Sequence, residues 1–243
     1  MGKTAGIVLI GNELLSGKVT DTNASYLCRE LRALGVAVRK ISVVPDEVDL
    51  IAAEVSEFSR AHDVVFTSGG VGPTHDDVTM EGVARAMGVP VVRDPRLVAL
   101  IARHAKGPLN EARLKMAEVP EGAELVAGEQ LMFPAVVARN VYILPGVPEI
   151  FRQKFEALKE RFRDAPYFLA SIFVGIGEGT LADYLNDLLR THPELMLGSY
   201  PEFSNPEYKV KVTLESKDRA LMEQAVAELL GRLPADAVIR VER

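Results

Sequence analysis

The segment from residue 63 to residue 79 constrains the fold of this chain more than any other. Its apolar part, residues 64–66, is β-branched and aromatic and predicts a buried parallel strand. Three glycines follow within four residues, at Gly69, Gly70 and Gly72. Because glycine has no Cβ, the backbone here can adopt positive φ and let a ligand approach its N–H groups. A glycine turn between a strand and a helix predicts an anion site; the alternative is a tight turn that binds nothing.

Two adjacent carboxylates, Asp76 and Asp77, come shortly after the glycine turn. Turn chemistry alone explains them poorly, which favours the ligand-binding interpretation. Thr79 then precedes a helical pattern over residues 80–87 that ends at Gly88. We expect Thr79 to be the N-cap of this helix.

The composition predicts a soluble globular protein. Of 243 residues, 48% are hydrophobic and 26% charged, which suffices for one large domain or two small ones with real cores. The net charge of −6 argues against nonspecific binding to nucleic acid or to an anionic membrane. The single cysteine, Cys28, excludes an internal disulfide and a multi-cysteine zinc site. With no signal peptide and no apolar run of roughly 18 residues, we expect a cytoplasmic protein.

Strand and helix patterns alternate over the first two thirds of the chain. Apolar runs predict strands at residues 5–10, 36–44, 64–66 and 141–144, and helical spacing predicts helices at 24–34, 48–58, 80–87, 95–101 and 149–162. Val136 and Val137 precede the last of these strands, as a hairpin or as a returning strand. The alternation favours a mostly parallel sheet covered by helices on both faces.

A different pattern begins after residue 164. Strands are predicted at residues 167–174, 195–198, 208–214 and 238–241, with helices at 180–189 and after Asp218. These elements predict a small α+β domain over residues 165–243, following an α/β domain over residues 1–164.

Acidic residues follow three predicted strands of the first domain, at Glu13, at Asp46 and at the pair Asp76 and Asp77. Mg²⁺ and similar cations are held by one or two carboxylates together with phosphate oxygens. The acids and the glycine turn together therefore fit a phosphate or diphosphate bridged by a metal. Taken singly, each acid can also be a solvated loop residue, and Asp46 can be the N-cap of the next helix.

Other sequence features point less clearly to chemistry. The glycine turn matches neither a dinucleotide fingerprint nor a Walker loop. The four histidines have no metal-ligand spacing, and His75 either contacts phosphate or is exposed. Ser68 lacks the nucleophile-elbow pattern. Cys28 lies beside an inward leucine, which predicts a packed thiol rather than a nucleophile.

Three motifs together resemble the MoaB/Mog-like molybdopterin-binding family. They are Gly11-Asn12-Glu13-Leu14-Leu15 with Asp21-Thr22-Asn23, then residues 68–79, and then Leu144-Pro145-Gly146-Val147-Pro148-Glu149. Their order and spacing are those of the CinA amino-terminal branch, and residues 175–178 resemble the start of the small domain that follows in CinA proteins. Residues 41–48, 140–142, 198–201 and 208–214 are still more similar to the molybdopterin-binding-like domain of eukaryotic FAD synthase.

The sequence departs from the CinA pattern in two ways. Gln130-Leu131-Met132-Phe133-Pro134-Ala135 stands where that pattern has Gly-Thr-Ala-Pro-Gly. The carboxy-terminal amidase domain of full-length CinA has no counterpart, so we do not expect deamidation of nicotinamide mononucleotide.

The resemblance implies a three-layer MoaB/Mog-like α/β fold with a mostly parallel sheet, plus the small carboxy-terminal α+β domain. It also implies roles for individual residues. Asp46 and Asp77 match active-site acids of the molybdenum-cofactor enzymes, and Glu13 matches the acid after the first strand, so the implied metal-binding residues are Glu13, Asp46 and Asp77. The implied substrate-binding residues are Gly69, Gly70, Gly72, Thr74, Asp76, Gly146 and Pro148.

The resemblance implies two candidate functions. In the CinA and FAD-synthase branches the pocket is associated with hydrolysis of a nucleotide diphosphate, which predicts release of AMP from FAD or ADP-ribose with Mg²⁺, Mn²⁺ or Co²⁺. Asp46 and Asp77 would be the catalytic residues. The alternative is a protein of molybdenum cofactor biosynthesis that binds or adenylates molybdopterin. A non-catalytic scaffold fits less well, because it needs neither the glycine turn nor the acidic pair.

The expected partner is a small molecule, either a nucleotide or a pterin, with no nucleic acid and no membrane. Residues 175–179 contain a glutamate and no lysine or arginine, which suits RNA contact poorly. Homo-oligomers are common in the family, so we expect a homodimer.

Overall fold

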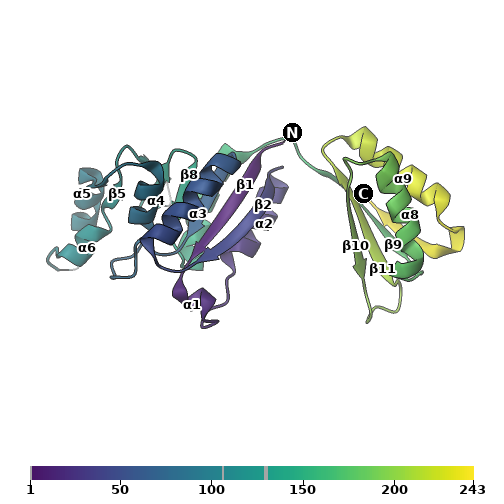
Figure 1. The fold of residues 1–243 in the computed structure, drawn as a ribbon, viewed down its shortest axis with the longest axis horizontal. Coiled ribbons are helices and arrows are strands. Elements are labelled where there is room, and N and C mark those ends of the chain that lie inside the picture. The colour runs from purple at the N-terminus through teal and green to yellow at the C-terminus, as the bar shows by residue number, and fades with distance from the viewer. Residues whose placement is uncertain (1, 106, 129–130) are drawn as a thin grey trace. The chain divides into compact units, whose positions relative to one another are not determined.

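A computed structural model describes residues 2–105, 107–128 and 131–243 (Figure 1). The chain divides into two compact units, Met1–Asp164 and Ala165–Arg243. Gln130, the first residue of the stretch that departs from the CinA pattern, lies outside the described residues. None of the helices in the described ranges is long and apolar enough to cross a membrane.

The first unit is built on a six-stranded, mostly parallel sheet with the strand order β2-β1-β3-β8-β7-β6. The strands are β1 (Thr4–Ile10), β2 (Ala37–Val44), β3 (Val64–Ser68), β6 (Glu124–Val126), β7 (Ala135–Ala138) and β8 (Val141–Leu144). β2, β1, β3 and β8 run parallel, while β7 pairs antiparallel with β8 and with β6. β8 therefore belongs to a hairpin and also returns beside β3.

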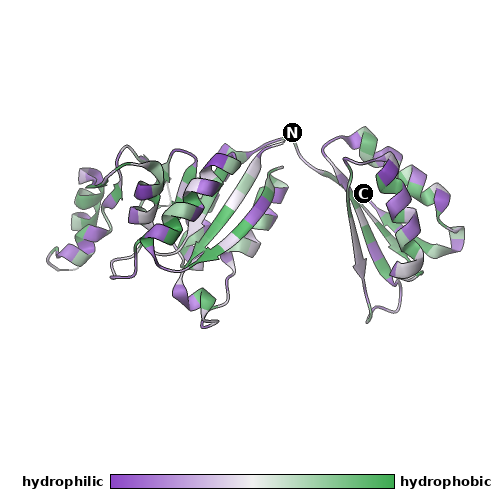
Figure 2. Ribbon diagram, viewed as in Figure 1, coloured by the Kyte–Doolittle hydropathy of each residue, from purple (hydrophilic) through white to green (hydrophobic). Residues whose placement is uncertain are grey.

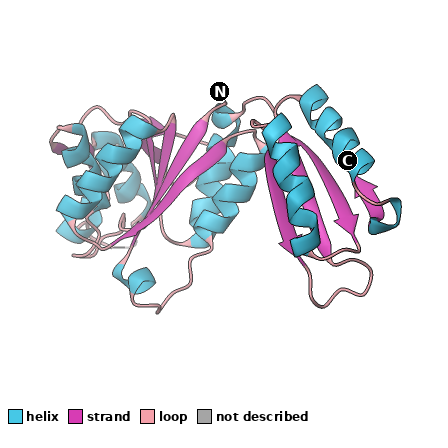
Figure 3. Cartoon of the chain, turned by 45° about the vertical axis from the view of Figure 1, so that its right-hand side comes forward, coloured by secondary structure: helices cyan, strands magenta, loops and turns pink. Residues whose placement is uncertain are grey.

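Helices cover both faces of this sheet (Figure 3). α2 (Asn23–Ala33) and α7 (Pro148–Leu158) contribute to the core on one face, and α3 (Val48–Ala61) and α4 (Thr79–Met87) to the core on the other. A short helix α1 (Asn12–Leu15) follows β1, and a 3₁₀ turn, Lys159–Phe162, continues α7. Hydrophobic residues lie along the central strands (Figure 2), as expected where both faces of a parallel sheet are buried. The predicted α/β class is confirmed.

Carboxylates accept hydrogen bonds from backbone N–H groups at the starts of α2 and α5 (Pro95–His104). Asp21 accepts a hydrogen bond from Asn23 N at 3.1 Å at the start of α2. Asp94 accepts one from Arg96 N at 2.8 Å, and Pro95 fills the first helical position of the next helix. Asp94 is the N-cap of α5, whereas the N-cap of α2 is Thr22 and Asp21 stands one residue before it. In both cases a carboxylate satisfies an N–H group that has no partner within the helix. The helices predicted from residue 24 and from residue 95 are confirmed, since α2 begins at Asn23 and α5 at Pro95.

A small lobe of two strands and two helices lies beside α4 (Figure 1). It consists of β4 (Val91–Arg93), α5 (Pro95–His104), α6 (Glu111–Lys115) and β5 (Glu118–Pro120), with β4 and β5 antiparallel. Leu97 and Ile101 of α5 are buried in the same core as α3 and α4. The lobe thereby adds a wall next to the loop that follows β3.

The order of the strands creates a crevice at the carboxyl ends of β1 and β3. The connection from β1 to β2 runs through α2 on one face, and the connection from β2 to β3 runs through α3 on the other. Open α/β sheets bind ligands at such a switch point, outside the carboxyl ends of the strands. The loops of residues 11–22 and 69–78 lie here, and both carry predicted site residues.

The second unit has the order strand, helix, two strands, helix, strand. Its elements are β9 (Phe168–Val174), α8 (Glu178–Thr191), β10 (Met196–Pro201), β11 (Val210–Ser216), α9 (Arg219–Arg232) and β12 (Val238–Glu242), with a 3₁₀ turn at Ala235–Ala237. The sheet order is β10-β11-β9-β12, all antiparallel. Asp218 caps α9 by accepting a hydrogen bond from Ala220 N at 2.9 Å. This is the split βαβ arrangement, and the predicted α+β class is confirmed.

Lys154 of α7 should make the free energy of unfolding depend on pH. Burial lowers the pKa of its ammonium from 10.5 to about 8, and Nζ donates to Pro134 O at 2.5 Å. Between pH 8 and 10.5 the unfolded chain therefore binds more protons than the folded chain, so the free energy of unfolding rises with pH in this window. Across this window we expect the free energy of unfolding of wild type to rise by on the order of 1–2 kcal/mol more than that of Lys154→Met.

Urea unfolding at pH 7.5 and at pH 10 measures this difference. In Lys18→Met, which removes an exposed lysine, the free energy of unfolding should still rise with pH as it does in wild type. If the free energies of unfolding of wild type and Lys154→Met changed by the same amount between the two pH values, the assigned pKa would be wrong.

Candidate functional site

The glycine turn after β3 presents three N–H groups in succession. Gly69 N donates to Leu144 O at 3.2 Å, which fixes the turn against the end of β8. Within the described part of the chain, the N–H groups of Gly70, Val71 and Gly72 donate to no protein acceptor. Gly70 has φ of +61°. Consecutive backbone N–H groups around a left-handed residue form a concave site for an anion.

Glycine is required in the turn because atoms of neighbouring segments lie where a Cβ would be placed. At Gly69, where φ is +112°, a Cβ would lie 2.1 Å from Ile10 O at the end of β1. At Gly70 a Cβ would lie 2.4 Å from Thr79 Oγ1. At Gly146, in the loop after β8, a Cβ would lie 3.4 Å from the Cα of Gly69. The ends of β1, β3 and β8 therefore meet here, which brings Gly146 to the glycine turn.

Thr79 does not cap α4, so that prediction is wrong. The residue before the helix is Val78, which makes no side-chain cap bond, and Thr79 is the first helical residue. Its hydroxyl donates to Gly69 O at 2.8 Å and its N–H to Gly70 O at 3.0 Å. These carbonyls need donors because the turn is partly buried, and Thr79 supplies both.

The acidic pair converges on one hydroxyl group. Thr74 Oγ1 lies 2.6 Å from Asp76 Oδ1 and 2.5 Å from Asp77 Oδ2, and Thr74 N donates to Asp77 Oδ2 at 2.8 Å. The hydrogen bond from Thr74 lowers the pKa of Asp76. Lys115 Nζ donates to Thr74 O on the same loop, and the His75 side chain is 97% exposed. Because a hydroxyl has one hydrogen to share between two carboxylates, a cation would suit this arrangement.

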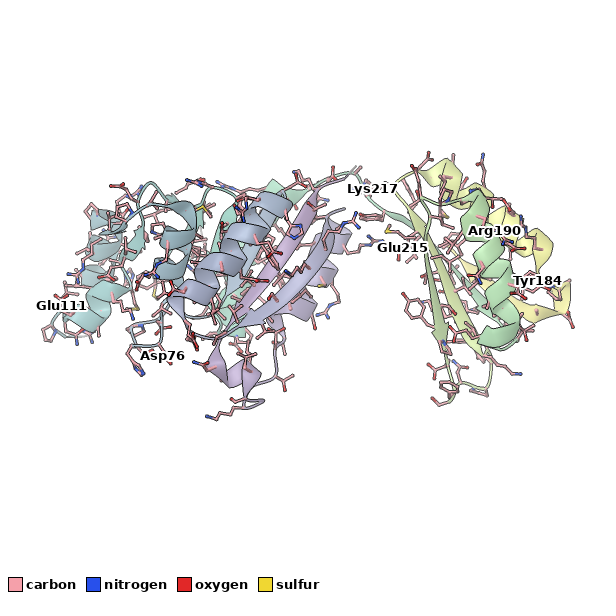
Figure 4. The ribbon with its side chains drawn as sticks, viewed as in Figure 1. Asp76, Glu111, Tyr184, Arg190, Glu215 and Lys217 are labelled. Atoms are coloured by element: carbon pink, nitrogen blue, oxygen red, sulfur yellow. The ribbon has the colours of Figure 1, made fainter. Side chains whose placement is uncertain are left out.

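A hollow of about 580 Å³, here named the acidic hollow, is bordered by Glu13, Asp46 and Asp76. Asp46 Oδ2 accepts a hydrogen bond from Asn12 N at 2.8 Å, which joins the loops after β1 and β2. The N-cap position of α3 is Glu47, and no side chain caps that helix. Asp46 is therefore not the N-cap that the sequence left open. Asp76 lies on the loop that hangs beside α4 (Figure 4).

Asp77 borders a different hollow, of about 590 Å³, together with Gly70 and Gly72. We name it the apolar hollow, after a wall of valine and methionine side chains. The three predicted metal ligands are thus not gathered around one hollow, and Asp76 takes the place expected for Asp77. In the described ranges, no group of three or more His, Cys, Asp or Glu side chains could hold a metal by itself. A cation here would need phosphate oxygens as well.

Asn23 stands out in the sequence only as part of the Asp21-Thr22-Asn23 motif, yet in the structure it joins two loops of the site. It is 3% exposed, and its Nδ2 donates to Ser68 Oγ at 3.0 Å and to Gly146 O at 2.9 Å. Its Oδ1 is buried and receives no hydrogen bond. Asn23, Gly146, Pro148 and Glu13 border a crevice of about 100 Å³. An N–H or O–H group of a water molecule or of a ligand would satisfy this acceptor.

Replacing Asn23 with alanine is expected to lower the free energy of unfolding by about 1–3 kcal/mol, because Ser68 Oγ and Gly146 O lose a buried donor. Ser68→Ala removes only one of the two bonds and should cost less. Urea unfolding at constant pH measures both variants. Stability of Asn23→Ala equal to that of wild type would show that the amide does not hold the loops together.

Cys28 is half-buried and packs against the core between α2 and the sheet. Burial raises the pKa of its thiol, which disfavours the reactive thiolate. The prediction of a packed thiol is confirmed.

Comparisons with known proteins find family matches for both units of the chain. Residues 6–164 match the model of a family described as "Probable molybdopterin binding domain". The chain belongs to this family. Residues 166–242 match the family "FAD synthase, middle domain". The two family models meet at residues 164–166, where the two structural units also divide.

Individual relatives of this family member cover most of its length. A protein of Archaeoglobus fulgidus is 38% identical over 91% of this chain and 94% of its own length. A "Probable FAD synthase" of Caenorhabditis briggsae is 34% identical over 94% of this chain and 50% of its own length. The chain thus spans about half the length of that relative. A crystal structure of a CinA protein with unknown function from Thermoplasma acidophilum matches 67% of this chain and 100% of its own, at 33% identity and a TM-score of 0.61. The predicted resemblance to CinA-like and FAD-synthase proteins is confirmed.

Proposed function

We propose that this protein is a divalent-metal-dependent nucleotide pyrophosphatase that hydrolyses the diphosphate of FAD or ADP-ribose and releases AMP. In this reaction water adds to one phosphorus and the bridging P–O–P bond breaks, so that FAD yields AMP and FMN, and ADP-ribose yields AMP and ribose phosphate. The observation that carries the proposal is the row of three backbone N–H groups from Gly70 to Gly72, which have no protein acceptor and lie on the same loop as the acidic pair.

The glycine turn would bind the diphosphate. Backbone N–H groups without a protein acceptor stabilise phosphate oxygens, and stabilise them more as negative charge develops in the transition state. The loops that hold the turn are tied by Gly69 N to Leu144 O and by Asn23 to Gly146 O, so the groups are positioned before substrate arrives. Such preorganisation favours catalysis over mere binding.

The carboxylates fit a hard cation. Asp76 and Asp77 share one Thr74 hydroxyl, and Asp76 borders the acidic hollow with Glu13 and Asp46. Mg²⁺, Mn²⁺ or Co²⁺ bound there together with phosphate oxygens would act as a Lewis acid that neutralises the diphosphate. Asp77, whose carboxylate lies next to Gly72, or Asp46, which borders the acidic hollow, would accept the proton of the attacking water.

A product assay tests this proposal. Purified protein is incubated with FAD, and separately with ADP-ribose, with each metal and with EDTA, and AMP is quantified by chromatography. Metal-dependent AMP that is lost in Asp77→Ala supports the proposal. Unchanged turnover of Asp77→Ala with the same metal requirement would show that the assigned mechanism is wrong.

Binding or adenylation of molybdopterin is the second candidate, because the matched family is described as a probable molybdopterin binding domain. Tight molybdopterin binding without hydrolysis of either dinucleotide would favour it. The match of residues 166–242 to the middle domain of FAD synthase weighs toward the flavin nucleotide.

A further inference from the structure

β10 forms one edge of the antiparallel sheet in the second unit (Figure 1). It pairs with β11 without a register shift, from Met196 opposite Glu215 to Pro201 opposite Val210. Among the described residues, no strand pairs with its other side. Such an edge presents unpaired backbone N–H and C=O groups, to which another strand can add.

The edges of the two larger sheets differ in how well they are protected against another strand. β2 carries Arg39 and Lys40, and its pairing with β1 skips Arg39. β12 carries Arg240 and Glu242 and has a register shift against β9, and β6 has only three residues. Charges, bulges and short length all hinder edge pairing. β10 has six uncharged residues, of which only Pro201 at its end restricts pairing, so it is the least protected edge in the described ranges.

The hydrogen-bond pattern shows which backbone groups of β10 face outward. Glu202 N donates to Lys209 O at 2.8 Å, directly after the last residue of the strand. Hydrogen-bonded positions alternate along an antiparallel pair, so the even-numbered residues of β10 bond to β11. Leu197 and Ser199 therefore direct their N–H and C=O groups to the free edge. Pro201, which has no N–H group, also falls on an outward-directed position, as expected for a proline at a sheet edge.

Side chains on both faces hold β10 in place. On the face covered by helices, Ser199 Oγ donates to Glu178 Oε1 of α8 at 2.6 Å. On the open face the Tyr200 side chain lies over Gly198, because a Cβ at Gly198 would lie 2.6 Å from the Tyr200 hydroxyl oxygen. Met196 and Tyr200 are 37% and 55% exposed. The edge is thus preformed, with a glycine at its centre, where another backbone can approach closely.

A second copy of β10 fits this edge in one antiparallel register. If Gly198 of each copy lies on a two-fold axis, Leu197 of one copy lies opposite Ser199 of the other, and each outward N–H meets an outward C=O. Met196 then lies opposite Tyr200 of the other copy, in a non-hydrogen-bonded pair where side chains are close. A methionine sulfur packs favourably against an aromatic ring. This register therefore covers the exposed apolar side chains of β10.

Other pairings fit the edge less well. A shift of the register by two residues would place Met196 opposite Glu202 or Gly198 and separate it from Tyr200. Pairing with β2 or β12 of another copy would bring charged side chains and a register shift to the interface. Since β10 fits its own copy better than the other edges, the association closes at two copies and does not extend into a filament.

We propose that two copies of this protein associate through β10, which pairs with itself about a two-fold axis and joins the two four-stranded sheets into one. The interface lies in the second unit, and the residues of β10 border neither the acidic hollow nor the glycine turn. The inference is therefore independent of the proposed function, and either can fail without the other.

A pair of cysteines tests the register. Met196→Cys and Tyr200→Cys are combined in one chain that also carries Cys28→Ala, so that no other thiol remains. Within one copy these positions lie about 13 Å apart along the strand, too far for a disulfide. Across the axis their Cα atoms would lie about 4.5 Å apart, within reach of one. Oxidation with diamide should convert most of the double variant into covalent dimers that dithiothreitol separates, while each single-cysteine variant should stay monomeric on a denaturing gel.

Sedimentation equilibrium tests the outward hydrogen bonds without cysteines. Ser199→Pro removes an outward N–H group together with the hydroxyl, and Ser199→Ala, the matched control, removes the hydroxyl alone. We expect the dimer dissociation constant of Ser199→Ala to stay within about threefold of wild type and that of Ser199→Pro to rise at least about tenfold. Circular dichroism verifies that each variant is folded, and the cysteine pair decides the question if Ser199→Pro is not.

Three results would overturn the inference. The first is a wild-type chain that stays monomeric at its highest soluble concentration. The second is equal dissociation constants for folded Ser199→Pro and Ser199→Ala, which would place the contact on another surface. The third is cross-linking of a single-cysteine variant as complete as that of the double variant, which would exclude the assigned register.

Discussion

Replacing Asp46 with asparagine is expected to lower metal-dependent AMP release roughly 100-fold, because the acidic hollow loses one of its charged oxygens. The fold should be retained. Asparagine keeps a side-chain oxygen that can accept the hydrogen bond from Asn12 N, which Asp46 Oδ2 accepts at 2.8 Å. The measurement is the initial rate of AMP formation from FAD or ADP-ribose at saturating metal.

Glu47→Gln is the matched control for this variant. It removes the same charge one residue further along, from an exposed side chain that neither caps α3 nor borders the acidic hollow. Its rate should stay within about twofold of wild type, since a screened surface charge contributes little. Equal rates for Asp46→Asn and Glu47→Gln would contradict the role assigned to Asp46. Partial recovery of Asp46→Asn at higher metal concentration would support a role in metal binding.

Replacing Gly69 with alanine is expected to have the largest effect on stability. The added Cβ would lie 2.1 Å from the backbone oxygen of Ile10, and φ is +112°, a value that residues with side chains rarely adopt. Neither backbone can move without disturbing the ends of β1 and β3. We expect the free energy of unfolding to fall by roughly 3–5 kcal/mol, from strain and overpacking together.

Gly88→Ala separates the two causes. Gly88 has φ of +69° at the end of α4, and an added Cβ there meets nothing within 4 Å. The free energy of unfolding of Gly88→Ala should fall by roughly 1–2 kcal/mol, only because alanine is unfavourable in the left-handed backbone conformation. Urea unfolding of both variants gives the difference. If Gly69→Ala were no less stable than Gly88→Ala, the close approach of β1 and β3 at the turn would be refuted.

The elements of this fold could be predicted because their signals are local. The buried run from Ala5 to Ile10, the cap at Asp94 and the alternation of Val210, Val212 and Leu214 are each visible within a few residues. The glycine turn was predictable for the same reason, since three glycines after an apolar strand have few other uses.

The details of the site depend on contacts between residues far apart in the sequence, so they could not be predicted. Asp76 and Asp77 are adjacent, and only the conformation of the loop decides which of them borders the acidic hollow. Asn23 lies 123 positions from Gly146, its hydrogen-bond partner. An asparagine that caps a helix and a buried asparagine that joins two loops cannot be told apart in sequence, because both stand near a helix start.

The prediction for Thr79 was wrong for a related physical reason. A threonine before a helical pattern is typical of an N-cap. In this protein the hydroxyl and the N–H group of Thr79 instead donate to the carbonyls of Gly69 and Gly70. The hydrogen bonds to the glycine turn thus determine the role of Thr79 at the start of α4.

The measurement that tests the central claim most directly is hydrolysis of FAD and of ADP-ribose in water enriched in ¹⁸O, with Mg²⁺, Mn²⁺ or Co²⁺, followed by mass spectrometry of the products. The account predicts AMP together with FMN or ribose phosphate, one ¹⁸O atom in one product of each pair, and no reaction in EDTA. The absence of AMP with every substrate and metal, from a protein shown to be folded, would contradict it and favour the molybdopterin-binding alternative.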